Sequence, residues 1–177
     1  MSTPSRLVRV LIADDHAPTR EDVRKALDAD ERFEVCGETA DAPGAVQAAV
    51  RERPDVCLLD VSMPGGGLSA AWEIAARLPR TKIVILTVSA EDADLFAALR
   101  AGAEGYLLKT MSFSQLPDAL DAVCSGEAAI PPGLVARLIK RFRAREPRWR
   151  HPLDHELGER LTSREWEVLE LLAEGCS

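Results

Sequence analysis

The feature that most constrains the fold of this chain is a regular alternation, over residues 6–125, of short apolar runs with stretches of helical length. The apolar runs are Val8–Ala13, Phe33–Cys36, Val56–Leu59, Ile83–Val88 and Tyr106–Leu108. The stretches with helical character are Thr19–Ala29, Ala42–Arg51, Leu68–Leu78, Ala93–Ala101 and Ser114–Val123. Such repeats are typical of an α/β fold, in which parallel strands form one sheet that helices cover on both faces.

The apolar content of the runs predicts their places in the sheet. The first, third and fourth runs are almost wholly apolar, as expected of central strands, whereas the second is partly polar, as expected of an edge strand. Right-handed crossovers then favour the doubly wound strand order 2-1-3-4-5. In this order the first and third strands are neighbours, so the residues that follow them meet at the switch point of the sheet.

Three aspartates follow these two strands. Asp14 and Asp15 come directly after Val8–Ala13, and Asp60 comes directly after Val56–Leu59, shortly before the turn Met63–Gly67. Carboxylates held close together raise one another's pKa unless a cation compensates their charge. Oxygen ligands with open positions suit Mg²⁺, or Mn²⁺ as the alternative. The three aspartates therefore predict a divalent metal site at the carboxyl edge of the sheet.

A hydroxyl and an ammonium group extend this set. Thr87 lies at the end of the fourth strand, and Lys109 follows the fifth strand, where its charge can pair with Asp60 or with a phosphoryl group on it. A metal beside a carboxylate permits phosphoryl transfer, because the cation offsets the repulsion between two anions. Aspartate is also a covalent acceptor in such reactions. The joint placement therefore predicts a phosphoryl-transfer site centred on Asp60.

The motifs that hold these residues resemble those of two-component response regulators of the NarL/FixJ type, which carry a CheY-like receiver of (βα)5 architecture. The receiver motifs are Leu11–His16, Leu58–Gly65, Ile85–Thr87 and Gly102–Lys109. A later segment, Leu161–Leu169, resembles the opening of a LuxR-type helix-turn-helix domain. The resemblance covers nearly the whole chain.

The resemblance implies a role for each residue of the acidic site. Asp60 is expected to be the phosphoacceptor and Asp15 a direct Mg²⁺ ligand, while Asp14 acts mainly through water. The backbone carbonyl of Ser62 is expected to complete the protein ligands.

The resemblance also implies a conformational switch. Thr87 would swing toward the phosphoryl group and Tyr106 would follow it inward, although Tyr106 could instead be a plain edge-strand aromatic. Ser62 and Ser89 stand two residues after Asp60 and Thr87, and both are small and polar. We hypothesise that they leave room for an attacking water, so that the acyl phosphate is not especially long-lived.

The pattern changes after Gly126 and predicts three segments: a receiver at 1–126, a linker at 127–160 and the start of a helix-turn-helix domain at 161–177. Pro131 and Pro132 begin a basic amphipathic helix in the linker. Arg137–Arg150 holds seven positive residues and one negative residue. This stretch could contact phosphates, but a linker helix with a solvated basic face is favoured; its apolar stripe could pack on the receiver or on a partner helix.

Thr162 and Glu165 form a capping box at the start of the last predicted helix, Thr162–Gly175. The chain stops before the recognition helix that would read the major groove, so no set of DNA-binding residues is complete in it. We therefore expect no sequence-specific DNA binding by this chain, and we expect this lone helix to be mobile or buried against another surface.

Composition places the chain among cytoplasmic proteins. It is 46% hydrophobic and 29% charged, with a formal net charge of −7. No apolar run approaches the roughly 20 residues of a membrane helix, and the N-terminus lacks the apolar core of a signal peptide. The four cysteines are widely spaced, as free thiols would be.

The leading prediction is a phosphorylation-dependent transcription regulator, with no enzymatic activity beyond its own phosphorylation and dephosphorylation. The expected partners are a sensor histidine kinase, a second copy of the chain after phosphorylation, and DNA in a full-length form; no membrane contact is expected. One alternative is a receiver that acts only through protein contacts. The other is a phosphatase like the haloacid dehalogenases, which would need an acid where this chain has Ser62.

Overall fold

The structure, a computed structural model, describes residues 7–145. The chain divides into two compact units between Leu138 and Ile139. The strands are β1 (Val8–Ala13), β2 (Phe33–Thr39), β3 (Val56–Leu59), β4 (Lys82–Thr87) and β5 (Ala103–Leu108). The α-helices are α1 (Ala17–Asp28), α2 (Ala42–Glu52), α3 (Gly67–Arg77), α4 (Asp92–Arg100), α5 (Leu116–Cys124) and α6 (Pro132–Arg145), and a short 3-10 helix (Phe113–Gln115) precedes α5.

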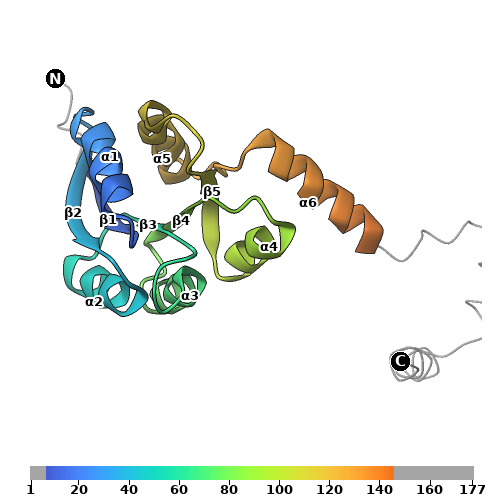
Figure 1. The fold of residues 1–177 in the computed structure, drawn as a ribbon, viewed down its shortest axis with the longest axis horizontal. Helices are drawn as coiled ribbons and strands as arrows, with labels where there is room; N and C mark the ends of the chain where they lie inside the picture. The colour runs from blue at the N-terminus through green and yellow to red at the C-terminus, as the bar shows by residue number, and fades with distance from the viewer. Residues whose placement is uncertain (1–6, 146–177) are drawn as a thin grey trace, which may run out of the picture. The chain divides into compact units, whose positions relative to one another are not determined.

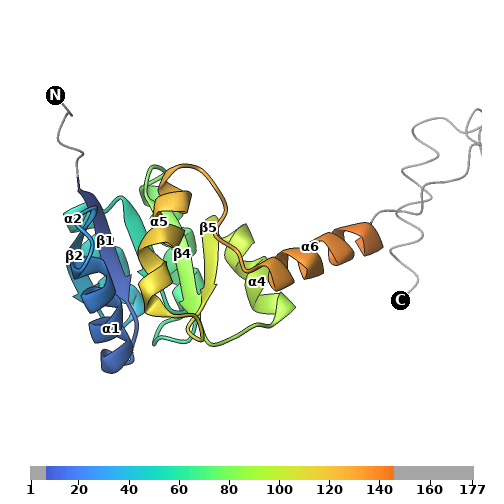
Figure 2. The same cartoon turned by 90° about the horizontal axis from the view of Figure 1, so that it is seen from above.

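The strands form one parallel sheet in the order β2-β1-β3-β4-β5, which confirms the predicted doubly wound fold. Helices α1 and α5 cover one face, and α2, α3 and α4 cover the other (Figure 1). Seen from above, α1 and α5 stand in front of the strands (Figure 2). The sheet therefore has a separate hydrophobic core on each face.

The alternation of side chains along each central strand fills both cores. In β1, Leu11 and Ala13 face the α2–α4 core, whereas Val10 and Ile12 face the α1–α5 core. All four residues of β3 are buried. Burying a large apolar side chain stabilises the fold by about 1.5–3 kcal/mol, so these runs could be predicted as strands from their composition alone.

Two strands are longer than their apolar runs predict. The edge strand β2 continues to Thr39, because its ladder with β1 persists through a register shift beside Leu11. At the other edge, β5 begins at Ala103, three residues before the predicted start at Tyr106. Gly105 lies against the side chains of Val84 and Val123, so a small residue is needed there and the apolar signal is weak.

Backbone hydrogen bonds continue the ladder beyond the strand ends and fix the residues that follow. The N–H of Asp60 donates to the carbonyl of Ala13 at 2.8 Å. The N–H of Lys109 donates to the carbonyl of Thr87 at the same distance. The sheet itself therefore places the polar residues at its carboxyl edge.

The loop between β3 and α3 folds back tightly on Asp60. The N–H of Gly67 donates to the carbonyl of Val61 at 3.0 Å, and the side chain of Met63 is buried beneath the loop. A Cβ atom on Gly67 would overlap the carbonyl oxygen of Asp60 and lie 2.7 Å from its carbonyl carbon. Glycine at this position thus allows α3 to start directly beside Asp60.

The linker returns along β5 before α6 begins. Ala129 forms a parallel bridge with Gly105, and its carbonyl accepts a hydrogen bond from the N–H of Tyr106 at 2.8 Å. Leu134 in the first turn of α6 is only 4% exposed and joins the α2–α4 core, with Leu138 packed beside it. The first part of the predicted apolar stripe therefore packs on the receiver.

Several predicted features lie outside the described residues: the rest of the linker after Arg145 and the helix Thr162–Gly175. The predicted boundaries at 126 and 160 stay predictions. Within residues 7–145, no helix combines the length and apolar character that crossing a membrane requires.

Replacing Gly67 with alanine should destabilise the fold by about 1–3 kcal/mol, because a Cβ there overpacks against the backbone of Asp60. The matched control is Gly133→Ala, since a Cβ on Gly133 meets nothing within 4 Å. Urea unfolding of both variants measures the difference. Equal stabilities would contradict the close approach of α3 to Asp60.

Candidate functional site

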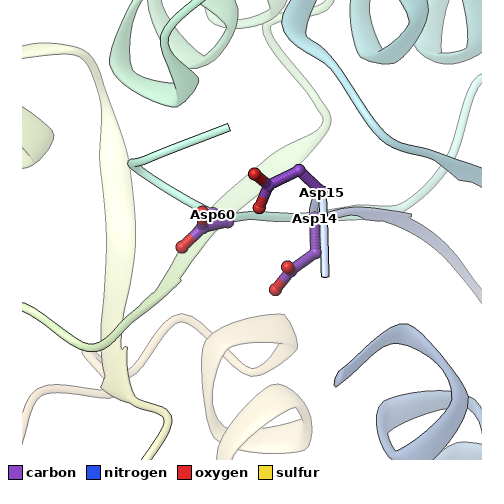
Figure 3. Close-up of side chains that lie close together, drawn as sticks. All are labelled: Asp14, Asp15 and Asp60. Carbon is purple, nitrogen blue, oxygen red and sulfur yellow. The ribbon is translucent and has the colours of Figure 1, made fainter. Parts of the chain in front are cut away.

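Three carboxylates converge where β1 and β3 end (Figure 3). One carboxylate oxygen from each of Asp14, Asp15 and Asp60 lies within 4.8 Å of the others. Asp14 and Asp60 are 2% and 3% exposed, whereas Asp15 is open to solvent. The predicted convergence of these side chains is therefore present, with one side of the cluster facing water.

Lys109 bridges the two buried members of the cluster. Its Nζ lies 2.7 Å from Oδ2 of Asp14 and 3.0 Å from Oδ1 of Asp60. Burial by itself would lower the pKa of Lys109, but its hydrogen bonds to the two carboxylates outweigh that effect and raise the pKa. The lysine therefore stays charged and holds the carboxylates of two different strand ends together.

The charge of Lys109 does not fully compensate Asp60. Burial raises the pKa of Asp60, the pairing with Lys109 opposes this rise, and the nearby charge of Asp14 adds to it. The N–H of Ser62 donates to Oδ2 of Asp60 at 3.0 Å and also favours the ionised form. Three carboxylates against one ammonium leave the site short of positive charge.

This donor set fits a hard divalent cation. All three side chains offer oxygen ligands, and the exposure of Asp15 leaves space for the waters that Mg²⁺ retains. Ser62 is exposed and its backbone N–H donates to Asp60, while the role of its carbonyl as a metal ligand stays a prediction. The residues present can thus hold Mg²⁺ beside Asp60.

Thr87 and Tyr106 are connected by Ser89, because the side chains of both form hydrogen bonds with its backbone. Thr87 is fully buried at the end of β4, and its hydroxyl accepts a hydrogen bond from the N–H of Ser89 at 3.1 Å. Tyr106 is also fully buried, and its hydroxyl donates to the carbonyl of Ser89 at 2.9 Å. Burial raises the pKa of Tyr106 to about 12, so the phenol keeps its proton and remains a donor.

The two serines that were predicted to admit water differ in their surroundings. Ser62 is exposed beside Asp60. Ser89 is partly buried, and its hydroxyl donates to Oδ2 of Asp94 at 2.5 Å. Neither side chain is bulky, and the hypothesis that water reaches Asp60 past them stays a prediction.

Sequence reasoning missed three residues whose side chains contact the loops and helix ends around the site. Arg20 of α1 donates to the backbone carbonyl of Asp14 at 2.6 Å. Asp94 of α4 accepts from Ser89, and Arg137 of α6 contacts the start of α4. Arg20 lies in the first turn of α1, five residues after Asp15, which was a usable signal, but the other two contacts depend on how a loop folds.

The arrangement can bring an anionic phosphoryl group to an anionic oxygen. Asp60 supplies the oxygen, and Lys109 and a metal at the carboxylates would balance the charge. Thr87 lies at the end of the strand next to β3, where its hydroxyl can be redirected toward the same space.

Comparison with known proteins places this geometry in a family. The model of the response regulator receiver domain matches residues 10–121. The transcriptional regulatory protein YxjL of Bacillus subtilis is 40% identical over 170 residues, covering 95% of this chain and 76% of the relative.

Solved structures agree with this assignment. The isolated receiver domain of RcsB from Salmonella enterica serovar Typhimurium, determined with the phosphomimetic BeF3−, superposes with a TM-score of 0.68 and 32% identity, covering 75% of this chain and 99% of that one. A structure of two RcsB dimers bound to two parallel DNAs has a TM-score of 0.70 and 31% identity, covering 97% of this chain and 79% of that one. The chain therefore belongs to the response regulators, and its relatives include transcription regulators of the NarL and LuxR type.

Proposed function

We propose that Asp60 accepts a phosphoryl group from the phosphohistidine of a sensor kinase and that this event controls transcription. The observation that carries the proposal is the bridge of Lys109 between Asp14 and Asp60 beside the exposed carboxylate of Asp15. It combines an oxygen nucleophile, a fixed positive charge and ligands for a cation in one place. Asp60 is the carboxylate of this set that follows β3, and it pairs with Lys109 at 3.0 Å.

The proposed transfer balances without a further reactant. An oxygen of Asp60 forms a bond to phosphorus while the phosphorus–nitrogen bond to the kinase histidine breaks. The electron pair of that bond stays on the nitrogen, and the imidazole, protonated at its other ring nitrogen, leaves as a neutral base. Mg²⁺, or Mn²⁺, held by Asp14, Asp15, Asp60 and the carbonyl of Ser62 would neutralise charge on the phosphoryl oxygens. Lys109 pairs with one of these oxygens, which relieves the excess negative charge of the site.

The phosphorylated site would then change the surface around α4 and β5. The hydroxyl of Thr87 turns toward the phosphoryl group, and the buried ring of Tyr106 responds because both contact Ser89. Water later hydrolyses the acyl phosphate and releases phosphate. Beyond this hydrolysis and the phosphoryl transfer to Asp60, the protein performs no catalysis.

The proposed output is dimerisation and, in a form with a complete helix-turn-helix domain, DNA binding in the cytoplasm. RcsB, a relative, is described as a dimer on DNA. The receiver would end near Gly126, with the linker at 127–160 and the DNA-binding domain from 161 onward.

Asp60→Asn should abolish labelling by acetyl phosphate in the presence of Mg²⁺, because the amide cannot form the acyl phosphate. The control is Asp22→Asn, which removes the same charge from the exposed face of α1. Phosphate-affinity electrophoresis or intact-mass measurement detects the added group. Labelling that survives in Asp60→Asn would refute the assignment.

Mg²⁺ at ten times its dissociation constant should stabilise the wild-type protein by about 1.4 kcal/mol, since a ligand that binds only the folded state adds RT ln(1 + [L]/Kd). Asp15→Asn should lose most of this gain at the same concentration because it removes an exposed ligand. Unfolding in Mg²⁺ and in a chelator measures both, with Asp28→Asn on the exposed surface of α1 as control. An unchanged gain in Asp15→Asn would exclude it as a ligand.

Ser89→Tyr should slow loss of the phosphoryl group several-fold, because a bulky ring would obstruct the water that attacks Asp60. Ser89→Ala, which loses the hydroxyl bonded to Asp94 but adds no bulk, should stay near the wild-type rate. The decay of purified phosphoprotein gives both rates. If the tyrosine variant decays as fast as wild type, the water-access hypothesis is wrong.

A further inference from the structure

The linker helix α6 is tied to the start of α4 by one side chain. Nε of Arg137 lies 2.6 Å from Oδ1 of Asp92, the first residue of α4. A terminal nitrogen of the same guanidinium donates to the carbonyl of Ala90 at 2.6 Å. Arg137 thus contacts the β4–α4 loop (residues 88–91) through the backbone of Ala90, and the first residue of α4 through the side chain of Asp92.

The same loop carries the contacts of the buried threonine and tyrosine. Ser89 donates its N–H to Thr87, accepts at its carbonyl from Tyr106 and donates its hydroxyl to Asp94. Ala90, which Arg137 holds, is the next residue along the chain. The residue that contacts Thr87 is therefore adjacent in the sequence to one that the linker helix contacts.

The start of α6 is also attached to the receiver independently of Arg137. Tyr106 donates its N–H to Ala129, and Leu134 is buried in the core below α4. Arg137 lies one turn beyond Leu134 and is 43% exposed, while its partner Asp92 is 37% exposed. Both side chains are partly exposed, although Oδ1 of Asp92 itself is covered, and ion pairs between partly exposed side chains contribute little stability, so a small shift of the loop can break this one.

Rotation of Thr87 would disturb that loop directly. The hydroxyl of Thr87 is occupied by the N–H of Ser89. If the hydroxyl turned toward a phosphoryl group on Asp60, Ser89 would lose its acceptor, and residues 89–90 would have to find a new arrangement. The carbonyl that Arg137 holds belongs to this stretch.

We propose that Arg137 is a latch that holds α6 on the β4–α4 loop and that phosphorylation of Asp60 releases it. The latched arrangement and the contact of Thr87 with a phosphoryl group are alternatives. This inference rests on the proposed function, because it requires a phosphoryl group on Asp60. Arg137 is then a positioning residue that couples phosphorylation of Asp60 to the attachment of the linker helix. Because such coupling is reciprocal, the contacts of Arg137 also weaken the binding of a phosphoryl group at the site.

The test measures that reciprocity in the full 177-residue chain with beryllofluoride and Mg²⁺, titrated while NMR follows the amide signal of Ser62, whose N–H donates to Asp60. Arg137→Ala should lower the dissociation constant for beryllofluoride about fivefold, the low end of typical couplings between sites. Lys140→Ala removes an exposed charge from the same helix and should match wild type. A dissociation constant for Arg137→Ala that equals or exceeds that of Lys140→Ala would overturn the latch.

Asp92→Ala provides the second variant. It should also tighten beryllofluoride binding, and adding it to Arg137→Ala should change nothing further, because both remove the same pair. Hydrogen exchange supplies an independent readout: amides of residues 133–138 should exchange faster in Arg137→Ala without beryllofluoride, and in wild type only with it. Additive effects of the two substitutions, or slower exchange on adding beryllofluoride, would overturn the proposal.

The same titration separates this proposal from the one before it. If wild type binds beryllofluoride and Asp60→Asn does not, the phosphoacceptor assignment stands, and the Arg137 result decides the latch alone. If wild type and Asp60→Asn bind beryllofluoride equally, the phosphoacceptor assignment fails, and the latch fails with it.

Discussion

The ion pairs of Lys109 with Asp14 and Asp60 are the interaction on which the rest of the structure depends. Removing a charge from water costs several kcal/mol per ion unless a partner compensates it. The compensation requires β5 to end where its lysine reaches the ends of β1 and β3, and therefore requires the strand order that is present. The pKa of Asp60 remains raised, so Lys109 does not fully compensate the negative charge of the site. A further positive charge would therefore stabilise the ionised carboxylates.

Backbone contacts fix the positions of the charged residues in this site. Ladder hydrogen bonds hold Asp60 against β1 and Lys109 against β4. The tight approach of Gly67 closes the loop over the acceptor. On the far side, Thr87 and Ser89 connect the same edge to α4, where Arg137 attaches the linker. The site and the proposed output are thus separated by a few residues of one loop, so a short-range change can pass between them.

Composition and spacing predicted the elements whose residues are buried on both sides, such as β3, and the convergence of the three aspartates, because both follow from strand order. They missed the start of β5, since Ala103 and Gly105 carry little apolar signal although both belong to the strand. They also missed the contacts of Arg137, because its partners lie 45 and 47 positions earlier and meet it only after the β4–α4 loop has folded. The sequence pattern thus predicted the candidate site. The contacts that connect this site to the linker helix could be found only in the tertiary structure.

The central claim is that the phosphoryl group resides on Asp60. Borohydride reduction of the acetyl-phosphate-treated protein converts an acyl phosphate of aspartate to homoserine, which peptide mass spectrometry can place in the sequence. The account predicts homoserine at position 60 in the phosphorylated protein, and at none of the neighbouring acids Asp14 and Asp15. Homoserine at either of these acids, or a label that borohydride leaves unchanged on His16, would contradict it.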